Sequence, residues 1–313
     1  MRQTDYLLPI GFYDLIGEEA KNNEKIIQII KDSFEKENFN IIKTPLLEFD
    51  DKIDDDSFKT MDILSKKFLK IRNDITPQII RLVETKFVNE NSELKLSYIG
   101  DVLKFENKDL FYERQLTQAG IEIISPTSKD VNFYIIDIIL KILEKLKLEN
   151  NLISFSVPGI LSRLITKLEI SNPENLIKSI KSKDILNIKK YGEKFSDILL
   201  QITLENFDKN LINEKILEPE KKNIKKILEI KERIEKKYQN TKIDIDLFDD
   251  NLSFQENFGF MMFVDNFKYP VSRGGEYKIG QKEAAGGTIY VNHLTKIKNL
   301  KPIIKTWIIQ LDE

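Results

Sequence analysis

Strand-like sequence gathers toward the two ends of this chain, and a long helical stretch separates the two groups. Alternating and β-branched residues predict strands up to the segment RQLTQAGIEIIS, which ends at Ser125. Helical spacing then dominates from about Val131 to about Tyr238, and strand-like runs return at KIDIDLF, FGFMMFVDNF and GGTIYVN. This order excludes the regular βαβ alternation of a doubly wound fold. We expect an α+β fold, in which an antiparallel sheet is flanked by helices and split by a mostly helical insertion.

Two boundaries divide the predicted architecture. We assign residues 1–157 and 241–313 to the core that carries the sheet, and residues 158–240 to the helical insertion. The strand-like run LISFSVPG directly precedes the insertion. The sequence contains no internal repeat and no low-complexity linker, so we expect one core with one insertion.

The composition excludes several classes of site. Cysteine is absent, which excludes disulfides, thiolate metal sites and cysteine nucleophiles. A zinc site or a Ser-His-Asp triad would depend on His293, the one histidine, so we expect neither a metal nor a cofactor. The longest apolar stretch contains Asp137 and Lys141, and no secretory signal opens the chain. We therefore expect a cytoplasmic protein that does not enter a membrane.

The charges are nearly balanced, with 49 basic and 51 acidic residues. The most basic run, KKNIKKILEIKERIEKKY, has helical spacing with interleaved glutamates, which is typical of a solvated helix face rather than a nucleic-acid site. Lysine supplies almost all of the positive charge. A chain of this kind keeps arginine where the planar guanidinium matters, so four arginines are of interest: Arg72, Arg81, Arg114 and Arg273.

The segment KIRNDITPQIIRL, from Lys70 to Leu82, predicts a strand followed by a helix. Phe68, Leu69 and Ile71 indicate a buried strand that breaks at Asn73-Asp74. Thr76 is a favourable N-cap residue and Pro77 a favourable first helical residue. On these grounds alone the segment is an ordinary helix start with an acidic residue in front of it.

Glycine is concentrated near the end of the predicted sheet. Five of the twelve glycines lie within RGGEYKIGQKEAAGG, from Arg273 to Gly287. Close approach of the backbone to another group explains such a cluster, and so does a tight hairpin. The lysine that follows Gly280 is displaced from the position in a phosphate-binding loop and no Ser or Thr comes after it, which excludes that motif.

Taken together, these segments resemble the catalytic core of the class II aminoacyl-tRNA synthetases, the histidyl branch in particular. The first motif of that family is similar to LPIGFYDLIGEEA with FNIIKTPLLE, where Pro45 is the motif proline. The second is similar to YIGDVLKFE with RQLTQAGIE, and the third to GGTIYVNHL. FQENFGF resembles the tyrosine-rich histidine-binding segment, and RGGEYK the "GGRYD" element. The likeness covers most of residues 7–125 and 243–295.

The resemblance implies a set of candidate residues for a bound histidine. Asp74 and Thr76 occupy the positions that hold the histidine amino group in the "LRPEGT" signature of the family. Gln118 and Glu122 match its Q-x-G-x-E segment, and Arg114 and Tyr277 are expected to line the same cavity. If the histidine site has been lost, these polar residues satisfy one another inside an inherited fold.

Three departures argue against the synthetase reaction, in which arginines stabilise the phosphates of ATP. Lys104 and His293 stand at the arginine positions of the second and third motifs, and Leu252 stands at the arginine position before the tyrosine segment. Both tyrosines of that segment are replaced, by Glu256 and Asn257. The chain ends about twenty residues after the third motif, so we expect no anticodon-binding domain and no tRNA partner.

One paralogous branch fits the description of a synthetase fold that has lost the synthetase reaction and the anticodon-binding domain. The run Asp-Ile-Thr-Pro-Gln, from Asp74 to Gln78, resembles the "LRPDITPQ" of the regulatory subunits of ATP phosphoribosyltransferase. The resemblance implies a non-catalytic subunit that activates a short catalytic subunit in the first step of histidine synthesis. It also implies a homodimer inside a hetero-octamer, and histidine as a candidate feedback ligand.

Two other functions are compatible with the sequence. A divergent histidyl-tRNA synthetase or another amino-acid-activating enzyme would show histidine-dependent pyrophosphate exchange. A binding module for a different partner, such as a kinase or a translation factor, is the other alternative.

Overall fold

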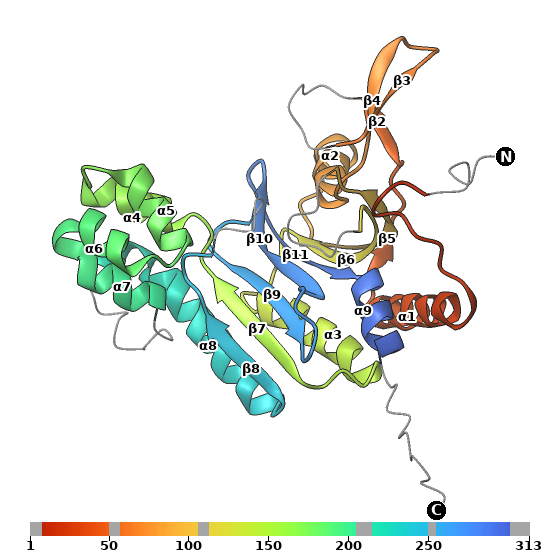
Figure 1. Ribbon diagram of the computed structural model, residues 1–313. Helices are drawn as coiled ribbons and strands as arrows, with labels where there is room; N and C mark the ends of the chain where they lie inside the picture. The colour runs from red at the N-terminus through yellow and green to blue at the C-terminus, as the bar shows by residue number, and fades with distance from the viewer. Residues whose placement is uncertain (1–7, 50–56, 106–112, 205–214, 250–254, 301–313) are drawn as a thin grey trace, which may run out of the picture.

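One eight-stranded sheet organises the computed structural model (Figure 1), which describes residues 8–49, 57–105, 113–204, 215–249 and 255–300. Its strands lie in the order β1 (Asn40–Ile41), β5 (Leu94–Leu103), β6 (Gln115–Ile124), β11 (Lys282–Tyr290), β10 (Ser272–Ile279), β9 (Gly259–Val264), β7 (Asn151–Ser156) and β8 (Thr241–Ile245). The N-terminal strands β1, β5 and β6 lie together, and the C-terminal strands β11, β10 and β9 follow them, so the two ends of the chain meet where β6 pairs with β11. The expected α+β architecture is confirmed.

The inner strands pair antiparallel, as the short loops and alternating residues predict. The two edge strands differ, because β1 pairs parallel with β5 and β8 pairs parallel with β7. A parallel pair needs a long crossover connection, and the helices between Ile160 and Lys237 supply it for β7 and β8. The sheet is therefore mixed at its edges and antiparallel in its centre.

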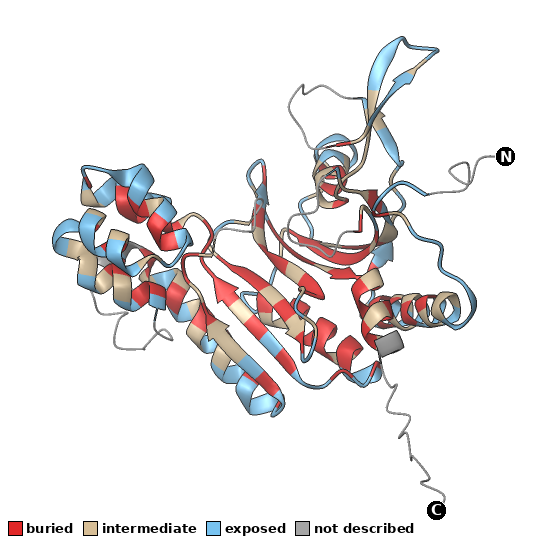
Figure 2. Cartoon of the chain, in the orientation of Figure 1, coloured by how far each residue is buried: buried red, intermediate tan, exposed pale blue. Residues whose placement is uncertain are grey.

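Helices α1 (Gly17–Lys36), α3 (Val131–Lys145) and α9 (Val291–Leu300) cover one face of the sheet. The α3 residues Ile135 and Ile139 lie directly against Gly287 of β11, where a Cβ atom would come within 3.0 Å of both side chains. Figure 2 shows that the inner strands and the sheet-facing side of α3 are buried. This layer holds the larger of the two hydrophobic clusters of the described residues.

Helix α2 (Thr76–Lys86) covers part of the opposite face. Its apolar side, with Ile79 and Val83, packs with Ile75 against Tyr98 of β5 and Tyr277 of β10 in the second, smaller cluster. The first turn of this helix thereby comes to lie over the centre of the sheet.

The segment predicted as an insertion contains a series of short helices that lead to one long helix. These are α4 (Ile160–Leu168), α5 (Pro173–Lys181), α6 (Ile185–Tyr191), η2 (Glu193–Phe195), α7 (Ser196–Leu204), η4 (Lys215–Glu220) and α8 (Lys221–Lys237). Asp184 caps α6, because its carboxylate accepts a hydrogen bond of 3.1 Å from the Asn187 backbone N–H. The last turn of α8 is tied to the core, where Asp137 of α3 binds Lys237 and Tyr238.

A separate three-stranded sheet, in the order β2 (Leu47–Phe49), β4 (Lys67–Ile71) and β3 (Lys59–Asp62), projects from the body of the molecule (Figure 1). The prediction of a buried strand over Phe68, Leu69 and Ile71 is wrong in its burial. Phe68 is 56% exposed and Met61 opposite it is 59% exposed. The strand exists, but its sheet projects from the helical layers, so Phe68 is exposed and Leu69 and Ile71 are only half-buried.

Pro45 lies between two strands that belong to different sheets. The segment FNIIKTPLLEF contributes β1 to the large sheet and β2 to the small one. A proline has no N–H to donate to a ladder, which suits the position where one sheet ends and the next begins.

No described helix is long and apolar enough to cross a bilayer.

Ile139→Ala tests the helical layer behind the sheet. The side chain is fully buried, so its truncation should lower the free energy of unfolding by about 2–5 kcal/mol, measured by urea denaturation. Leu186→Ala on α6 is the matched control, since Leu186 is 80% exposed and its truncation should change the stability by less than about 0.5 kcal/mol. Equal losses in the two variants would contradict this packing.

Candidate functional site

Five of the six residues predicted to bind histidine come together beneath the first turn of α2. Gln118 and Glu122 lie four residues apart on β6, so their side chains leave the same face of the sheet. Tyr277 approaches from β10, and Asp74 and Thr76 approach from the start of α2. We call these five residues the Glu122 cluster: Asp74, Thr76, Gln118, Glu122 and Tyr277.

Glu122 is the centre of this cluster. Its two carboxylate oxygens accept hydrogen bonds from the Tyr277 hydroxyl, at 2.8 Å, and from the Thr76 hydroxyl, at 3.1 Å. The side chain is almost fully enclosed, because Glu122 is only 1% exposed. Within the described residues this carboxylate has hydroxyl partners and no ion pair.

The start of α2 is bound to the floor of the cluster through backbone N–H groups. The Ile75 N–H donates to Gln118 Oε1 at 3.2 Å, and the Thr76 N–H donates to Asp74 Oδ1 at 3.2 Å. Ile75 occupies the N-cap position, so the prediction of Thr76 as the N-cap residue is wrong by one position. The acceptors of the cap come from Asp74 and from the neighbouring strand, which leaves the Thr76 hydroxyl to bind Glu122.

Glycines make room for these side chains. A Cβ atom added to Gly286, opposite Glu122 in the ladder, would overlap the Glu122 carboxylate, and one added to Gly120 would overlap the Tyr98 ring. Gly280 instead adopts a φ of +57° in the two-residue turn between β10 and β11. Close approach to another group therefore explains Gly286, and a tight hairpin explains Gly280.

Burial governs the ionisation of the cluster. It raises the pKa of the Glu122 carboxyl to about 7, and the nearby Asp74 carboxylate adds to the increase, while the bonds from Tyr277 and Thr76 oppose it. Burial likewise raises the pKa of the Tyr277 and Tyr98 hydroxyls well above the ordinary value. Two neighbouring acidic groups, of which Glu122 is buried among hydroxyls, suit a cationic ligand such as an ammonium group, which would favour ionised Glu122.

Arg114, the sixth predicted residue, does not reach the cluster. It precedes β6, eight residues from Glu122, which corresponds to roughly 26 Å along an extended strand. Its guanidinium lies 4.5 Å from the centre of the Phe58 ring and is also flanked by Phe12 and Phe105. Arg114 thus occupies an aromatic enclosure at the far end of the strand.

Two of the three altered synthetase positions lie in the described part of the chain. His293 is completely buried, and burial lowers its pKa to about 4, so the imidazole is neutral at pH 7. Its Nδ1 atom lies 2.7 Å from the Pro270 carbonyl oxygen. Lys104 is half-buried beside Arg114, to whose carbonyl its backbone N–H donates at 2.7 Å. Leu252 lies outside the described residues.

Sequence reasoning missed two residues that complete the cluster. The hydroxyl groups of Tyr98 on β5 and Thr288 on β11 lie 2.8 Å apart, on either side of Gly120. A signal was available, because antiparallel pairing of the two predicted strands around Gly120 brings Tyr98 to the face that carries Glu122. No such signal identifies Thr288 before the neighbour of β6 is known.

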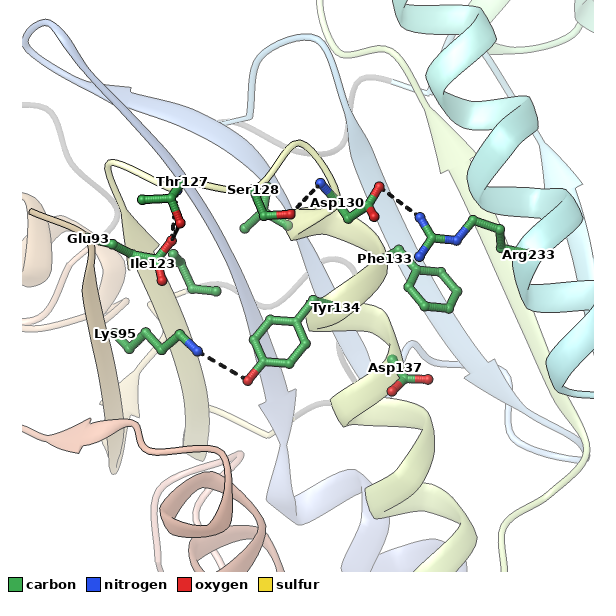
Figure 3. A pocket seen from close by; sticks show the side chains of 11 residues that line it. Glu93, Lys95, Ile123, Thr127, Ser128, Asp130, Phe133, Tyr134, Asp137 and Arg233 are labelled. Carbon is green, nitrogen blue, oxygen red and sulfur yellow. Dashed lines mark hydrogen bonds and ion pairs between the residues drawn. The ribbon is translucent and has the colours of Figure 1, made fainter.

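Other cavities lie beside the cluster rather than in it. Tyr277 also borders a cavity of about 580 Å³ between the β10–β11 hairpin and α8. A second cavity, of about 410 Å³, lies between β5, α3 and α8 (Figure 3). There Lys95 binds the Tyr134 hydroxyl at 3.3 Å and Arg233 binds Asp130 at 2.8 Å, so its cations already have partners. No group of side chains that could hold a metal ion occurs in the described ranges.

Comparisons with known proteins show which family and which relatives this chain resembles. A family model described as histidyl-tRNA synthetase matches residues 11–294. A relative from Paramagnetospirillum magneticum, named ATP phosphoribosyltransferase regulatory subunit, is 33% identical over 38% of the chain and 33% of its own length. A relative of the same name from Polynucleobacter asymbioticus is 26% identical over 87% of the chain and 76% of its own length. The chain spans only 33–53% of the length of the three foremost of these relatives.

Two solved structures share the fold. One is an ATP phosphoribosyltransferase regulatory subunit/histidyl-tRNA synthetase from Bacillus halodurans, with a TM-score of 0.78 and 17% identity, covering 96% of this chain and 84% of that one. The other belongs to the ATP phosphoribosyltransferase complex of Thermotoga maritima, with a TM-score of 0.71 and 17% identity, covering 86% of this chain and 97% of that one. They confirm the expected class II synthetase-like fold.

Glu122→Gln tests the buried carboxyl through the pH dependence of stability. A pKa raised to about 7 in the folded protein means that the folded state binds more protons than the unfolded state between about pH 4.5 and 7. The stability that Glu122 contributes is therefore complete below that window and is lost as the pH rises through about 7. Relative to Glu122→Gln, the wild type should lose unfolding free energy from pH 5 to pH 8 in urea denaturation.

Glu24→Gln, which alters an exposed carboxylate of α1, is the control for this comparison. The difference between wild type and Glu24→Gln should not follow the same slope. A flat difference for Glu122→Gln across the whole range would show that Glu122 is ionised throughout.

Proposed function

Because the chain belongs to the histidyl-tRNA synthetase family, we propose that it is a regulatory member of that family, a non-catalytic subunit of ATP phosphoribosyltransferase. Its role would be to activate a short catalytic subunit in the first step of histidine synthesis. One observation carries this proposal. The residues that match the amino-group half of the synthetase site come together around Glu122, whereas the residues that match its phosphate-facing positions are Lys104 and the buried, neutral His293.

Electrostatics separates this function from the alternative of an amino-acid-activating enzyme. Formation of an aminoacyl adenylate develops negative charge on phosphate groups, which arginine forks stabilise by paired hydrogen bonds. A lysine supplies a point charge, and a neutral imidazole enclosed by Phe267, Tyr269 and Tyr290 supplies no cation. We therefore expect no catalysis of its own and no tRNA partner. The names of the relatives support a regulatory subunit.

We propose that the Glu122 cluster binds histidine as the feedback ligand. The ammonium group of the ligand would lie between Asp74 and Glu122, and it would replace the missing countercharge of the buried carboxylate. Histidine regulates the complex only if it binds one state better than another, and the partner then changes histidine affinity by the same factor.

The division of the chain and its assembly form part of the same proposal. Residues 1–157 and 241–313 would act as the synthetase-like core, and residues 158–240 would form the insertion. An ion pair between Asp137 and Lys237 joins the insertion to the core. We propose a homodimer within a hetero-oligomer, a hetero-octamer by resemblance, that works in the cytoplasm.

Assembly with a short catalytic subunit tests the central role. The two proteins, mixed after separate purification, should co-elute, and the rate of phosphoribosyl-ATP formation should rise at least about tenfold, corresponding to about 1.4 kcal/mol of coupling. The catalytic subunit alone and the same subunit with serum albumin are the controls. The absence of both co-elution and activation would exclude this function. Pyrophosphate exchange by the chain alone that depends on histidine and ATP would favour the amino-acid-activating enzyme.

Calorimetric titration with L-histidine tests the ligand. The wild-type chain should bind histidine, alone or in the complex, and Glu122→Gln should weaken binding at least about tenfold because the charge that faces the ammonium group is removed. Glu24→Gln on α1 should bind as the wild type does. If neither the chain alone nor the complex released or absorbed heat with millimolar histidine, histidine would be excluded as the ligand.

A further inference from the structure

The first turn of α2 is bound on both of its sides. Toward the large sheet, Thr76 donates to Glu122 and the Ile75 N–H donates to Gln118, as described above. Toward the small sheet, the Gln78 amide donates to the Pro45 carbonyl at 2.8 Å and accepts from the Thr44 hydroxyl at 2.6 Å. The same turn therefore connects the Glu122 cluster with the chain that enters β2.

A second contact, one turn later, strengthens the connection to β2. Arg81 pairs with Glu48 of β2 at 2.6 Å. Glu48 lies opposite Lys70 of β4, and β4 in turn pairs with β3, so the three strands form one hydrogen-bonded unit. Displacement of residues 44–48 would therefore carry the small sheet along.

Arg72 marks the fixed end of this unit. Its side chain donates to the Asp101 carbonyl of β5 at 2.6 Å and to the Thr44 carbonyl at 3.0 Å. Its own carbonyl accepts from the Leu103 N–H at 3.0 Å. The small sheet is thus anchored to the large one at its base, and its far end, the β3–β4 turn, lies free of the body in Figure 1.

The cluster is closed in this arrangement. Glu122, Gln118 and Ile75 are each 1% exposed, and the place of a Cβ atom at Gly286 is already filled by the Glu122 carboxylate. On the side of α2, the Thr76 hydroxyl occupies the Glu122 oxygen that a ligand ammonium group would bind. Entry of a ligand from this side therefore requires the first turn of α2 to move.

We propose that the first turn of α2 is a lid over the Glu122 cluster, and that Gln78 couples the opening of this lid to a movement of the three-stranded sheet about Arg72. The inference rests on histidine being the ligand of the cluster. The coupling follows from the burial of Gln78, which is 1% exposed. If the lid moved alone, the buried Gln78 amide would lose its hydrogen bonds to Thr44 and Pro45, so movement as one unit is favoured.

The absence of cysteine makes this movement measurable with introduced labels. Leu64→Cys at the β3–β4 turn, where Leu64 is 94% exposed, and Lys25→Cys on the exposed side of α1 give one spin label on the small sheet and one on the body. The full chain is labelled and then assembled with the catalytic subunit. Addition of L-histidine should shift the distance between the labels by more than about 2 Å in double electron–electron resonance.

Gln78→Ala in the labelled chain should still bind histidine in calorimetry while most of the distance shift is lost. Gln28→Ala is the matched control, because Gln28 donates to Asp32 on the exposed side of α1 and the loss of this bond should leave the distance shift intact. Thr44→Val removes one bond of the connection with a smaller change, and it should reduce the shift if Gln78→Ala fails to fold.

Three results would overturn the proposal. Histidine binding without any shift in the wild type would show that the cluster opens without the small sheet. A full shift in both Gln78→Ala and Thr44→Val would show that Gln78 does not couple the two. An absence of histidine binding to the complex would remove the ligand. Activation of the catalytic subunit is measured separately, so in each case the regulatory function stands or fails independently.

Discussion

The arrangement of the site depends on one buried carboxylate that is held by hydroxyl groups. Glu122 is enclosed by Thr76 from α2 and Tyr277 from β10, and the space that it occupies exists because Gly286 has no side chain. Removing a charge from water is costly without a partner of opposite charge, and this cost raises the pKa of Glu122 to about 7. Position, protonation and access at the site all follow from this constraint.

The same constraint supports the proposal that the amino-group half of a synthetase site remains while its ATP half is lost. A buried acid without a countercharge retains the chemistry that would recognise an amino group. Activation of an amino acid also needs fixed cations around ATP, and the buried imidazole of His293 and the lysine at position 104 do not provide arginine forks. Under the proposed function the chain would bind an amino acid without activating it, which is the property that a feedback subunit needs.

Local patterns predicted the parts of the fold that depend on local physics. The strand–helix junction at Lys70 to Leu82, the antiparallel pair that ends at Ser125 and the helical stretch after Val131 follow from periodicity and turn chemistry. The exposure of β4 was not predictable, because an apolar strand that projects in a small sheet has the same sequence pattern as a buried one. The parallel edge strands were missed for a similar reason, since pairing direction is decided by distant segments.

The site was predictable where strand periodicity carried the information. Gln118 and Glu122 share a face because they lie four residues apart on one strand, and the motif resemblance added Asp74, Thr76 and Tyr277. Arg114 belongs to the same motif, yet it precedes β6 and lies among three phenylalanine rings, away from the cluster. Thr288 depended on which strand lies beside β6, and the order of strands in a sheet cannot be read from a single sequence.

The most direct test of the account is histidine inhibition of the assembled complex, compared between the wild-type chain and Glu122→Gln. If the chain regulates a short catalytic subunit through the Glu122 cluster, both complexes should form phosphoribosyl-ATP, and histidine should inhibit the wild-type complex but not the variant at the same concentration. Equal inhibition of both complexes, in an assay where the catalytic subunit alone is not inhibited, would contradict it.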